Sequence, residues 1–335
     1  MMKIATYLVE NDYMADPAVH VFEGKLYIYP SHDRESGIPE NDNGDHFDMN
    51  DYHVFSTSDI ENEPLTDHGV ILKVSDIPWA GRQLWDSDVA TKNGKYYLYF
   101  SLKDKNDIFR IGVAVSDKPE GPFIPQPDPI RGSYSIDPCI FEEDGNHYMF
   151  FGGLWGGQLQ RYKDNKALEF AHLPEGNEWT LPSRVVKLSD DMLGFAEEPR
   201  PLEIFNPDGT PLKASQTDIR FFEASWMHQY KGIYYFSYST GDTHQLCYAT
   251  SDNLYGPFTY QGVILTPVVG WTTHHSIMEF KGKWYLFHHD CVPSEGKTWL
   301  RSLKVIELEY DDSDRIGTLP GVVSDFDNIM NNFVS

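Results

Sequence analysis

The stretch Asp88-Val89-Ala90-Thr91-Lys92-Asn93-Gly94-Lys95-Tyr96-Tyr97-Leu98-Tyr99 decides the fold of this chain. An acidic residue leads a short β-rich run, a polar residue and a glycine follow, and an aromatic strand comes next. Two such runs joined by a glycine-containing turn are typical of a β-hairpin, because glycine readily adopts the positive φ of a tight turn. This hairpin phrase occurs five times, and the other four copies begin at Asp16, Asp137, Glu223 and His275.

Five copies of the hairpin phrase predict an all-β protein with the architecture of a five-bladed β-propeller. Small four-stranded sheets repeated around an axis protect the strand edges that isolated hairpins would leave open. We expect a single propeller domain over residues 1–335. The leading residues of the five copies then lie on equivalent strands, which predicts that one end of the axis gathers Asp16, Asp88, Asp137, Glu223 and His275.

The remaining segments fill in the blades. Residues 112–117 and 247–252 both end in Ser-Asp and precede Gly-Pro-Phe, and residues 52–59 are a weaker copy, so all three are predicted third strands. Residues 152–220 lack the hairpin phrase and are predicted to complete the third blade with long decorations. Residues 304–310 are expected to form a strand that closes the ring.

The charge of the chain argues against several classes of partner. With 27 basic and 51 acidic residues the formal net charge is −24, so nucleic acid or an anionic membrane surface would be repelled. The start lacks the apolar segment of a secretory signal, and the three cysteines show no metal-like spacing. We therefore expect a cytoplasmic protein, although a signal segment removed earlier would leave the same start.

Three leading carboxylates have the best-matching contexts: Asp16 before Pro17, Asp137 before Pro138, and Glu223 before Ala224. Hydrolysis of a glycosidic bond needs one carboxylic acid to protonate the leaving oxygen and one carboxylate to act on water or on carbon. A third carboxylate nearby raises the pKa of the acid, because like charges held close together do not all ionise readily. Asp before Pro is also a common turn opener, so a structural role stays open. For Asp88, a structural or channel role is expected.

Other residues near the hairpins are candidates for binding a sugar. Aromatic rings stack on sugar faces, although they belong more often to a core. The candidates are Phe47, Trp85 and Trp155, together with the polar residues Asp33 and His244. His275 stands in a histidine-rich run, but no zinc-type spacing or cysteine partner accompanies it. A hydrogen-bonding histidine is the simpler interpretation.

The motifs as a set resemble glycoside hydrolase family 43, over nearly the whole chain and in the same order. They are Asp16-Pro17, Asp137-Pro138, Phe222-Glu223-Ala224, His274-His275-Ser276 and Lys281-Gly282-Lys283-Trp284-Tyr285. The resemblance implies a five-bladed propeller enzyme that acts on xylan and arabinan side chains and on oligosaccharides. It also implies inversion of the anomeric configuration, which suits a base that acts through water.

The resemblance also assigns roles to individual residues. It makes Asp16 the general base, Glu223 the general acid, and Asp137 the residue that tunes the pKa of the acid and orients it. His275 resembles a histidine that contacts a calcium ion in the channel, and a mostly hydrated ion is implied because calcium prefers oxygen ligands. Arg301 resembles the arginine that reaches the sugar hydroxyls, with an outward-facing arginine as the structural alternative.

The expected reaction is the release of terminal β-D-xylose, and in the same pocket of α-L-arabinofuranose, from xylo- or arabino-oligosaccharides. Many β-xylosidases of the family carry a C-terminal β-sandwich that adds an aromatic residue to the pocket, and we expect this chain to lack it. Loops around Phe47, Trp85 or Trp155 would then close the pocket. Two alternatives stay open, a dedicated α-L-arabinofuranosidase and a sugar-binding propeller without catalysis. The oligomeric state is open as well.

Overall fold

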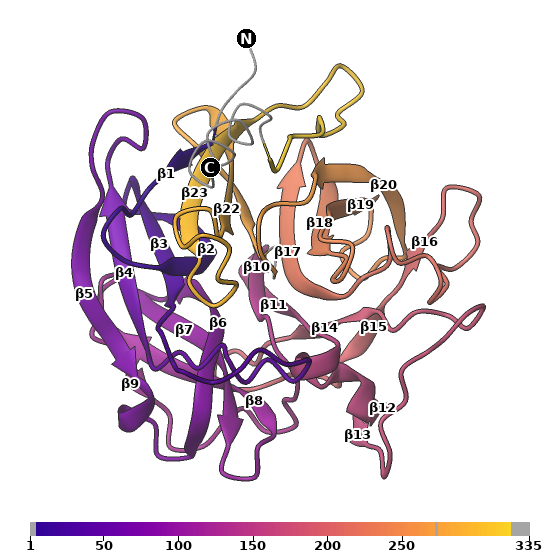
Figure 1. The fold of residues 1–335 in the computed structure, drawn as a ribbon, viewed down its shortest axis with the longest axis horizontal. Coiled ribbons are helices and arrows are strands. Elements are labelled where there is room, and N and C mark those ends of the chain that lie inside the picture. Colours follow the sequence, from indigo (N-terminus) through magenta and orange to yellow (C-terminus); the bar gives the residue numbers. More distant parts are fainter. Residues whose placement is uncertain (1–4, 272–273, 323–335) are drawn as a thin grey trace, which may run out of the picture.

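The fold is a ring of five sheets, seen in a computed structural model that describes residues 5–271 and 274–322. Residues 1–4, 272–273 and 323–335, which include the start of the chain, two residues of the histidine-rich run and the C-terminal end, lie outside the described residues. Figure 1 shows the five sheets arranged around a common centre. The predicted all-β, five-bladed propeller is confirmed.

Each blade begins at the centre with the strand that opens a hairpin phrase. Blade 1 contains β2 (Met14–Phe22), β3 (Lys25–His32), β4 (Asp51–Thr57) and β5 (Thr66–Lys73). Blade 2 contains β6 (Ala80–Lys92), β7 (Lys95–Asp104), β8 (Phe109–Ser116) and β9 (Ile124–Pro125). Blade 3 contains β10 (Cys139–Glu143), β11 (Asn146–Phe151), β14 (Ser183–Lys187) and β15 (Arg200–Leu202). Blade 4 contains β17 (Glu223–Tyr230), β18 (Ile233–Ser239), β19 (Leu246–Ser251) and β20 (Phe258–Leu265). Blade 5 contains β21 (Ser276–Phe280), β22 (Lys283–Asp290), β23 (Ser302–Leu308) and β1 (Thr6–Tyr7).

Short elements decorate this ring. Strand β16 (Ile204–Phe205) pairs parallel with β20, and β12 (Tyr162–Lys163) pairs with β13 (Lys166–Ala167). The described residues include the 3₁₀ segments η1 (Val74–Asp76), η2 (Trp155–Gly157) and η3 (Leu159–Arg161). The predicted third strands are found as β4, β8 and β19, and the interval 152–220 supplies β14 and β15 to blade 3.

The five hairpin turns form as the sequence predicts. In each turn a polar residue and the following glycine both have positive φ, for example 53° at Asn93 and 73° at Gly94. Such two-residue turns match the twist of the flanking strands, and glycine adopts the required conformation without strain. The aromatic side chains of the second strands are then buried in the blades, with no exposed surface at Tyr99, Phe150 and Phe236.

The N-terminal strand closes the ring. Strand β1 pairs antiparallel with β23, and Thr6 lies opposite Val305, so both ends of the propeller share blade 5. The Tyr7 hydroxyl donates a hydrogen bond to Asp290 Oδ1 at 2.8 Å, which ties β1 to β22. Residues 304–310 were expected to close the ring. Residues 304–308 lie in β23, which closes the ring as expected, and it does so by pairing with β1 from the start of the chain.

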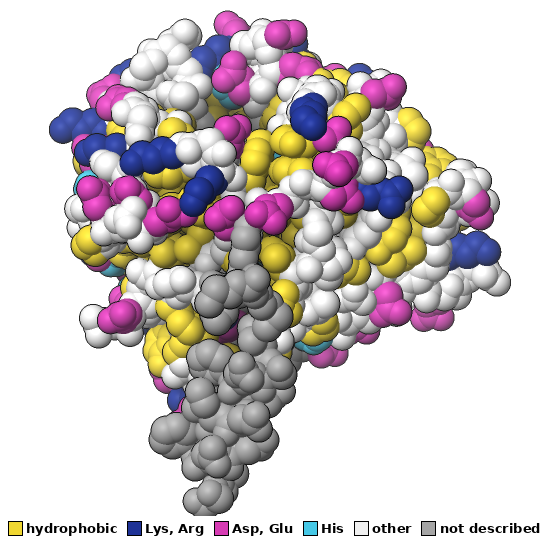
Figure 2. Space-filling model, turned by 90° about the horizontal axis from the view of Figure 1, so that it is seen from above, with side chains coloured by type: hydrophobic (Ala, Val, Ile, Leu, Met, Phe, Trp, Pro, Cys, Tyr) yellow, Lys and Arg dark blue, Asp and Glu magenta, His cyan; other side chains and the backbone are white. Residues whose placement is uncertain are grey.

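The surface of the ring is strongly acidic. Asp and Glu side chains are spread over the face in Figure 2, with Lys and Arg side chains between them. Within the described part of the chain, none of the helices has the length and apolar character needed to cross a bilayer. The expected repulsion of polyanions stays a prediction from the charge.

The inner strands are irregular where the leading residues lie. The pairing of β2 with β3 shifts register around Asp16, and the pairing of β17 with β18 shifts just after Glu223. Asp16 has a φ of 47°, and Asp137, which lies just before β10, has a φ of 60°. Bulges redirect side chains and are enriched next to functional sites. Here they turn acidic side chains out of the regular alternation of the strands.

Candidate active site

A cavity of about 450 Å³ opens where the inner strands of the five blades begin, a size typical of small-molecule sites. Its charged and titratable lining includes Asp16, Asp86, Asp137, Glu223, His274 and Arg301. These residues come from all five blades, in chain order around the ring. The four carboxylate residues are buried, with 9 % exposure or less. The cavity therefore brings together ionisable side chains that are poorly accessible to water.

Three of the five leading residues line this cavity, namely Asp16, Asp137 and Glu223. Asp88 does not line it. Its carboxylate accepts hydrogen bonds from the Ile140 N–H at 2.5 Å and pairs with His20, so it joins blade 2 to blades 3 and 1. The expectation that all five leading residues meet at one end is wrong for Asp88, which has a structural contact instead, and for His275.

Asp86 is a member of the site that the hairpin phrase does not single out. Strand β6 bulges between Leu84 and Ser87, so Asp86 occupies the irregular position that Asp16 occupies in blade 1. Its Oδ1 lies 2.6 Å from Nδ1 of His274. A signal was present in the spacing: Asp86 stands eight residues before the turn glycine Gly94, as Asp16 does before Gly24, whereas Asp88 stands only six residues before it.

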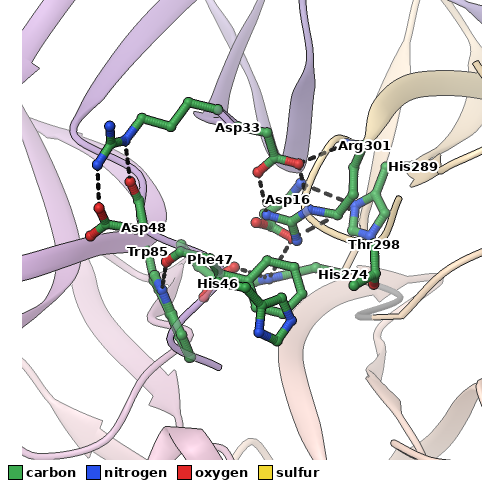
Figure 3. A network of polar contacts seen from close by, with 12 residues as sticks. Asp16, Asp33, His46, Phe47, Asp48, Trp85, His274, His289, Thr298 and Arg301 are labelled. Carbon is green, nitrogen blue, oxygen red and sulfur yellow. Dashed lines mark hydrogen bonds and ion pairs between the residues drawn. The ribbon is translucent and has the colours of Figure 1, made fainter. Parts of the chain in front are cut away.

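Arg301 holds two carboxylates of blade 1 at once, as Figure 3 shows. Its Nη2 and Nε donate to the two oxygens of Asp33 at 2.7 and 2.8 Å, and its Nη1 donates to Asp16 Oδ1 at 2.7 Å. The guanidinium also lies 4.9 Å from the ring centre of Phe47. Only 2 % of Arg301 is exposed, which rules out the outward-facing alternative. This arginine precedes β23, so the network joins blade 5 to blade 1.

Asp33 has a different place from the one predicted. It was a candidate sugar ligand, but it does not line the cavity and is 2 % exposed. Both of its carboxylate oxygens are bonded to Arg301. Asp33 therefore anchors Arg301. Of these two carboxylates bonded to Arg301, only Asp16 lines the cavity.

Aromatic side chains form two walls of the cavity. Phe47 and Trp85 meet edge to face with ring centres 6.2 Å apart, and Trp85 Nε1 donates to the Phe47 carbonyl at 2.6 Å. Trp155 and Trp271 stack with ring centres 5.8 Å apart. All four line the cavity, so the three predicted rings lie at the site and Trp271 joins them. Such faces are suited to stacking on a sugar ring.

His244, also a candidate for the pocket, lies one layer behind this wall. It does not line the cavity, and its ring packs edge-on against Trp271 with ring centres 4.5 Å apart. Trp271 itself lines the cavity. His244 is therefore in a position to support Trp271, and direct contact with a sugar is not indicated.

The loop before β4 lines the cavity more extensively than its sequence suggests. Its polar, acidic composition favoured a solvated loop at most positions, yet the lining includes Glu40, Asn41, Asp42, Gly44, His46 and Met49. Gly44 has a φ of 69°, and an added Cβ would lie 2.7 Å from the Trp85 ring. Glycine at this point allows the loop to close over the tryptophan.

Burial and repulsion keep protons on part of the carboxylate cluster. Burial, with the charges of Asp86 and Asp16, raises the pKa of Glu223 to about 8. Burial and the adjacent Asp86 also raise the pKa of Asp137 well above its ordinary value. Against the effect of burial, His274 and the adjacent Asp137 carboxyl hold the pKa of Asp86 below its usual range. Glu223 is thus protonated at neutral pH and Asp86 is ionised.

Asp16 differs from Glu223 because it has a cation as a direct partner. Burial raises the pKa of Asp16 to about 7, while the charge of Arg301 opposes the rise. Asp16 therefore ionises at lower pH than Glu223. Two titratable groups whose environments separate their pKa values are the arrangement that acid and base catalysis requires.

His275 lies behind the cavity, where the sequence had suggested a calcium contact. It is fully buried, its Nε2 lies 2.6 Å from Ser237 Oγ, and its Nδ1 has no hydrogen-bond partner. Neighbouring residues of an extended chain point to opposite sides, so His274 faces the cavity instead. The groups that depress the pKa of His275, after burial, are other histidines. Such surroundings suit a calcium ion poorly.

Comparison with known proteins assigns this arrangement to a family. The family description "Glycosyl hydrolases family 43" matches residues 8–315. The chain belongs to glycoside hydrolase family 43. The propeller and the converging carboxylates are therefore those of a glycoside hydrolase.

This family 43 enzyme has relatives that match almost its whole length. It is 74 % identical over 316 residues to a xylosidase/arabinosidase of Bacteroides ovatus, covering 94 % of this chain and 97 % of that protein. The solved structure of RS223-β-xylosidase has a TM-score of 0.94 at 72 % identity, covering 96 % of this chain and 99 % of that one. A β-xylosidase/α-arabinofuranosidase from a compost microbial metagenome, solved with xylotriose in a calcium-free form, has a TM-score of 0.93 at 55 % identity, covering 96 % and 100 %.

Removing the Asp33 carboxylate is expected to destabilise this family 43 enzyme strongly. Asp33→Ala leaves the buried Arg301 with one carboxylate fewer, and loss of a partner from a buried ion pair costs roughly 3–5 kcal/mol. The matched control is Asp117→Ala, which breaks a pair with Lys95 whose side chains are 49 % and 76 % exposed. That change should cost at most about 1 kcal/mol. Urea and thermal unfolding compare the two variants, and similar losses would contradict the anchoring role of Asp33.

Proposed function

We propose that this enzyme releases terminal β-D-xylose from short xylo-oligosaccharides, that it also accepts terminal α-L-arabinofuranose, and that it inverts the anomeric centre. The observation that carries the proposal is the cavity in which a protonated Glu223 and an ionisable Asp16 come together from different blades. Relatives named xylosidase/arabinosidase and β-xylosidase, and the xylotriose complex of one of them, support the choice of sugar.

In the proposed reaction Glu223 is the general acid and Asp16 the general base. Glu223 donates its proton to the glycosidic oxygen as the bond between that oxygen and the anomeric carbon breaks. Asp16 accepts a proton from a water whose oxygen forms the new bond to the anomeric carbon from the opposite side. Glu223 ends ionised and Asp16 protonated, and exchange with solvent restores both groups. The Arg301 contact fixes the orientation of Asp16 for this step.

Asp137 is proposed to tune and position the acid. Its Oδ2 accepts a hydrogen bond from the Ala224 N–H at 2.6 Å, which fixes the peptide that follows Glu223. The charge of Glu223 is among the causes that raise the pKa of Asp137, so the two groups are close enough to influence each other. A protonated neighbour and a fixed backbone hold the Glu223 carboxyl in a defined direction, which is the condition for efficient proton transfer.

Two rival functions are less well supported. A sugar-binding propeller without catalysis has no need for an acid whose pKa is raised to about 8 beside a base paired with arginine. A dedicated α-L-arabinofuranosidase would share the catalytic groups and differ in the walls of the cavity. A cytoplasmic location, with short oligosaccharides as substrates, remains a prediction from the sequence.

A calcium ion, which the calcium-free form of one relative suggests for the family, is proposed to lie at Asp16, Asp86 and His274. These residues bring three ligand atoms within 4.8 Å of one another at the cavity. Two carboxylates fit the oxygen preference of calcium better than the histidine-rich surroundings of His275 do. A bound calcium would supply positive charge that favours the ionised forms of Asp16 and Asp86.

The substrate assignment predicts the products of xylotriose hydrolysis. The enzyme should hydrolyse aryl β-D-xylopyranosides with a higher kcat/KM than aryl α-L-arabinofuranosides, and should release xylose from one end of xylotriose. Proton NMR of the first products should show α-xylose, because water attacks the face opposite the leaving group. Initial β-xylose would contradict inversion, and tight binding of xylotriose without turnover would favour the binding protein.

Glu223→Gln tests the general acid. The variant should lose about 10²–10⁴-fold in kcat/KM on xylobiose, whose leaving oxygen needs a proton, and far less on an aryl xyloside with an acidic leaving group. In chelator-treated wild type, kcat/KM should fall above about pH 8, where Glu223 loses its proton, and below about pH 7, where Asp16 gains one. The variant should lack the alkaline limb on the aryl substrate. Glu279→Gln, an exposed change on β21, is the control. Equal losses on both substrates would refute the acid assignment.

The calcium proposal predicts which residues carry the response to the ion. After treatment with chelator, added calcium should raise the melting temperature of the wild type and should raise that of Asp86→Asn much less. His275→Asn should respond like the wild type. If His275→Asn loses the response and Asp86→Asn keeps it, the ion lies behind the cavity and the proposed ligand set is wrong.

A further inference from the structure

A second cluster of metal-ligating side chains lies on blade 1, outside the active site. His32 ends β3, and Asp51 and His53 stand two residues apart at the start of β4. Ser31 pairs with Tyr52, which places His32 opposite Asp51 in the antiparallel ladder. Cross-strand partners and alternate residues of one strand share a face of the sheet. The two imidazoles and the carboxylate therefore project from the same side of the blade.

The three side chains are close enough to share one ion. His32 Nδ1 lies 2.6 Å from Asp51 Oδ1, and the rings of His32 and His53 have centres 4.8 Å apart. One ligand atom from each residue lies within 4.8 Å of the others. Donors about 2.1 Å from a tetrahedral zinc ion are about 3.4 Å apart, so small side-chain shifts suffice. The side chains are 14 to 24 % exposed, which leaves the cluster accessible from solvent.

Two further carboxylates hold the outer nitrogens of the histidines. Asp12 lies 3.2 Å from His32 Nε2, and Asp67 lies 3.2 Å from His53 Nδ1. A carboxylate on the outer ring nitrogen fixes the tautomer and orientation of a metal-binding histidine. This arrangement leaves His32 Nδ1, which contacts Asp51, and His53 Nε2 as the nitrogens available to a shared ion. The three carboxylates around the two imidazole rings also attract a cation.

We propose that His32, Asp51 and His53 form a binding site for a divalent ion of the zinc class, with water as the remaining ligand. Two imidazole nitrogens and one carboxylate oxygen suit zinc and its neighbours in the first transition series, whereas calcium prefers oxygen ligands. None of the three residues lines the active-site cavity, so this site is separate from the proposed calcium site. Without an ion, the same contacts would be those of a His32 imidazolium shared by Asp51 and Asp12.

Titration of tag-free, chelator-treated enzyme with Zn²⁺ distinguishes the two interpretations. Calorimetry should show a zinc-binding step in the wild type, with an apparent Kd that rises at least 100-fold in His53→Asn. Asp67→Asn, which removes the carboxylate behind His53, should weaken the same step by about 10–100-fold. Co²⁺ in place of zinc should give visible d–d absorption that is lost in His53→Asn. Hydrolysis of an aryl xyloside by metal-free His53→Asn should equal that of the wild type.

Two controls separate this site from other zinc-binding groups. His172→Asn removes a histidine whose side chain is 62 % exposed and should leave the zinc step unchanged. Asp86→Asn alters the active-site cluster and should keep it as well. The proposal is overturned if the wild type shows no zinc step, if the step disappears in Asp86→Asn, or if His53→Asn binds zinc as the wild type does. Should His53→Asn fail to fold, unchanged zinc affinity in Asp67→Asn overturns it.

Discussion

The active site depends on one buried ion-pair network, in which Arg301 holds Asp16 and Asp33. The guanidinium comes from blade 5 and the two carboxylates from blade 1, so the network spans the seam at which the ring closes. Its planar fork matches the two oxygens of Asp33 and leaves a further N–H for Asp16. Because only 2 % of Arg301 is exposed, these charges are poorly screened. One contact thus fixes the seam, the direction of the proposed base and its tendency to ionise.

The distribution of cations around the cavity explains which carboxylates keep their protons. Both cationic groups of the lining, Arg301 and His274, belong to blade 5. They contact Asp16 of blade 1 and Asp86 of blade 2, which lowers the cost of ionising these two groups. Asp137 and Glu223 of blades 3 and 4 have no such partner among the described hydrogen bonds and ion pairs, and burial raises the pKa of both. The order of the blades therefore separates the proposed acid from the proposed base.

The sequence predicts the features that have a local physical cause. A two-residue turn needs a glycine-like conformation, so five turns of this kind could be found from Asn93-Gly94 and its counterparts. The repeated phrase also identified three residues of the cavity lining, Asp16, Asp137 and Glu223, because each of them leads one copy of it. Asp86 and His274 were missed although each stands eight residues before its turn glycine, the spacing that Asp16 and Asp137 also have. The predicted Asp88 and His275 stand six and seven residues before theirs, so the bulge and the pleat place them away from the cavity. The bond between Asp33 and Arg301 joins residues 268 positions apart, and no local pattern signals it.

Backbone strain accounts for the choice of residue at the leading positions. Asp16 and Asp137 have φ values of 47° and 60°, a region that costs most side chains energy but that aspartate adopts more readily than most. A leading residue in these blades must therefore supply a carboxylate and also tolerate the left-handed conformation, and aspartate does both. In blade 4 the leading residue is the longer Glu223. The residue with the strained, positive φ is there the next one, Ala224, at 63°. Asp137 accepts the N–H of that same residue, so one carboxyl group stabilises the strained peptide on which the reach of Glu223 depends.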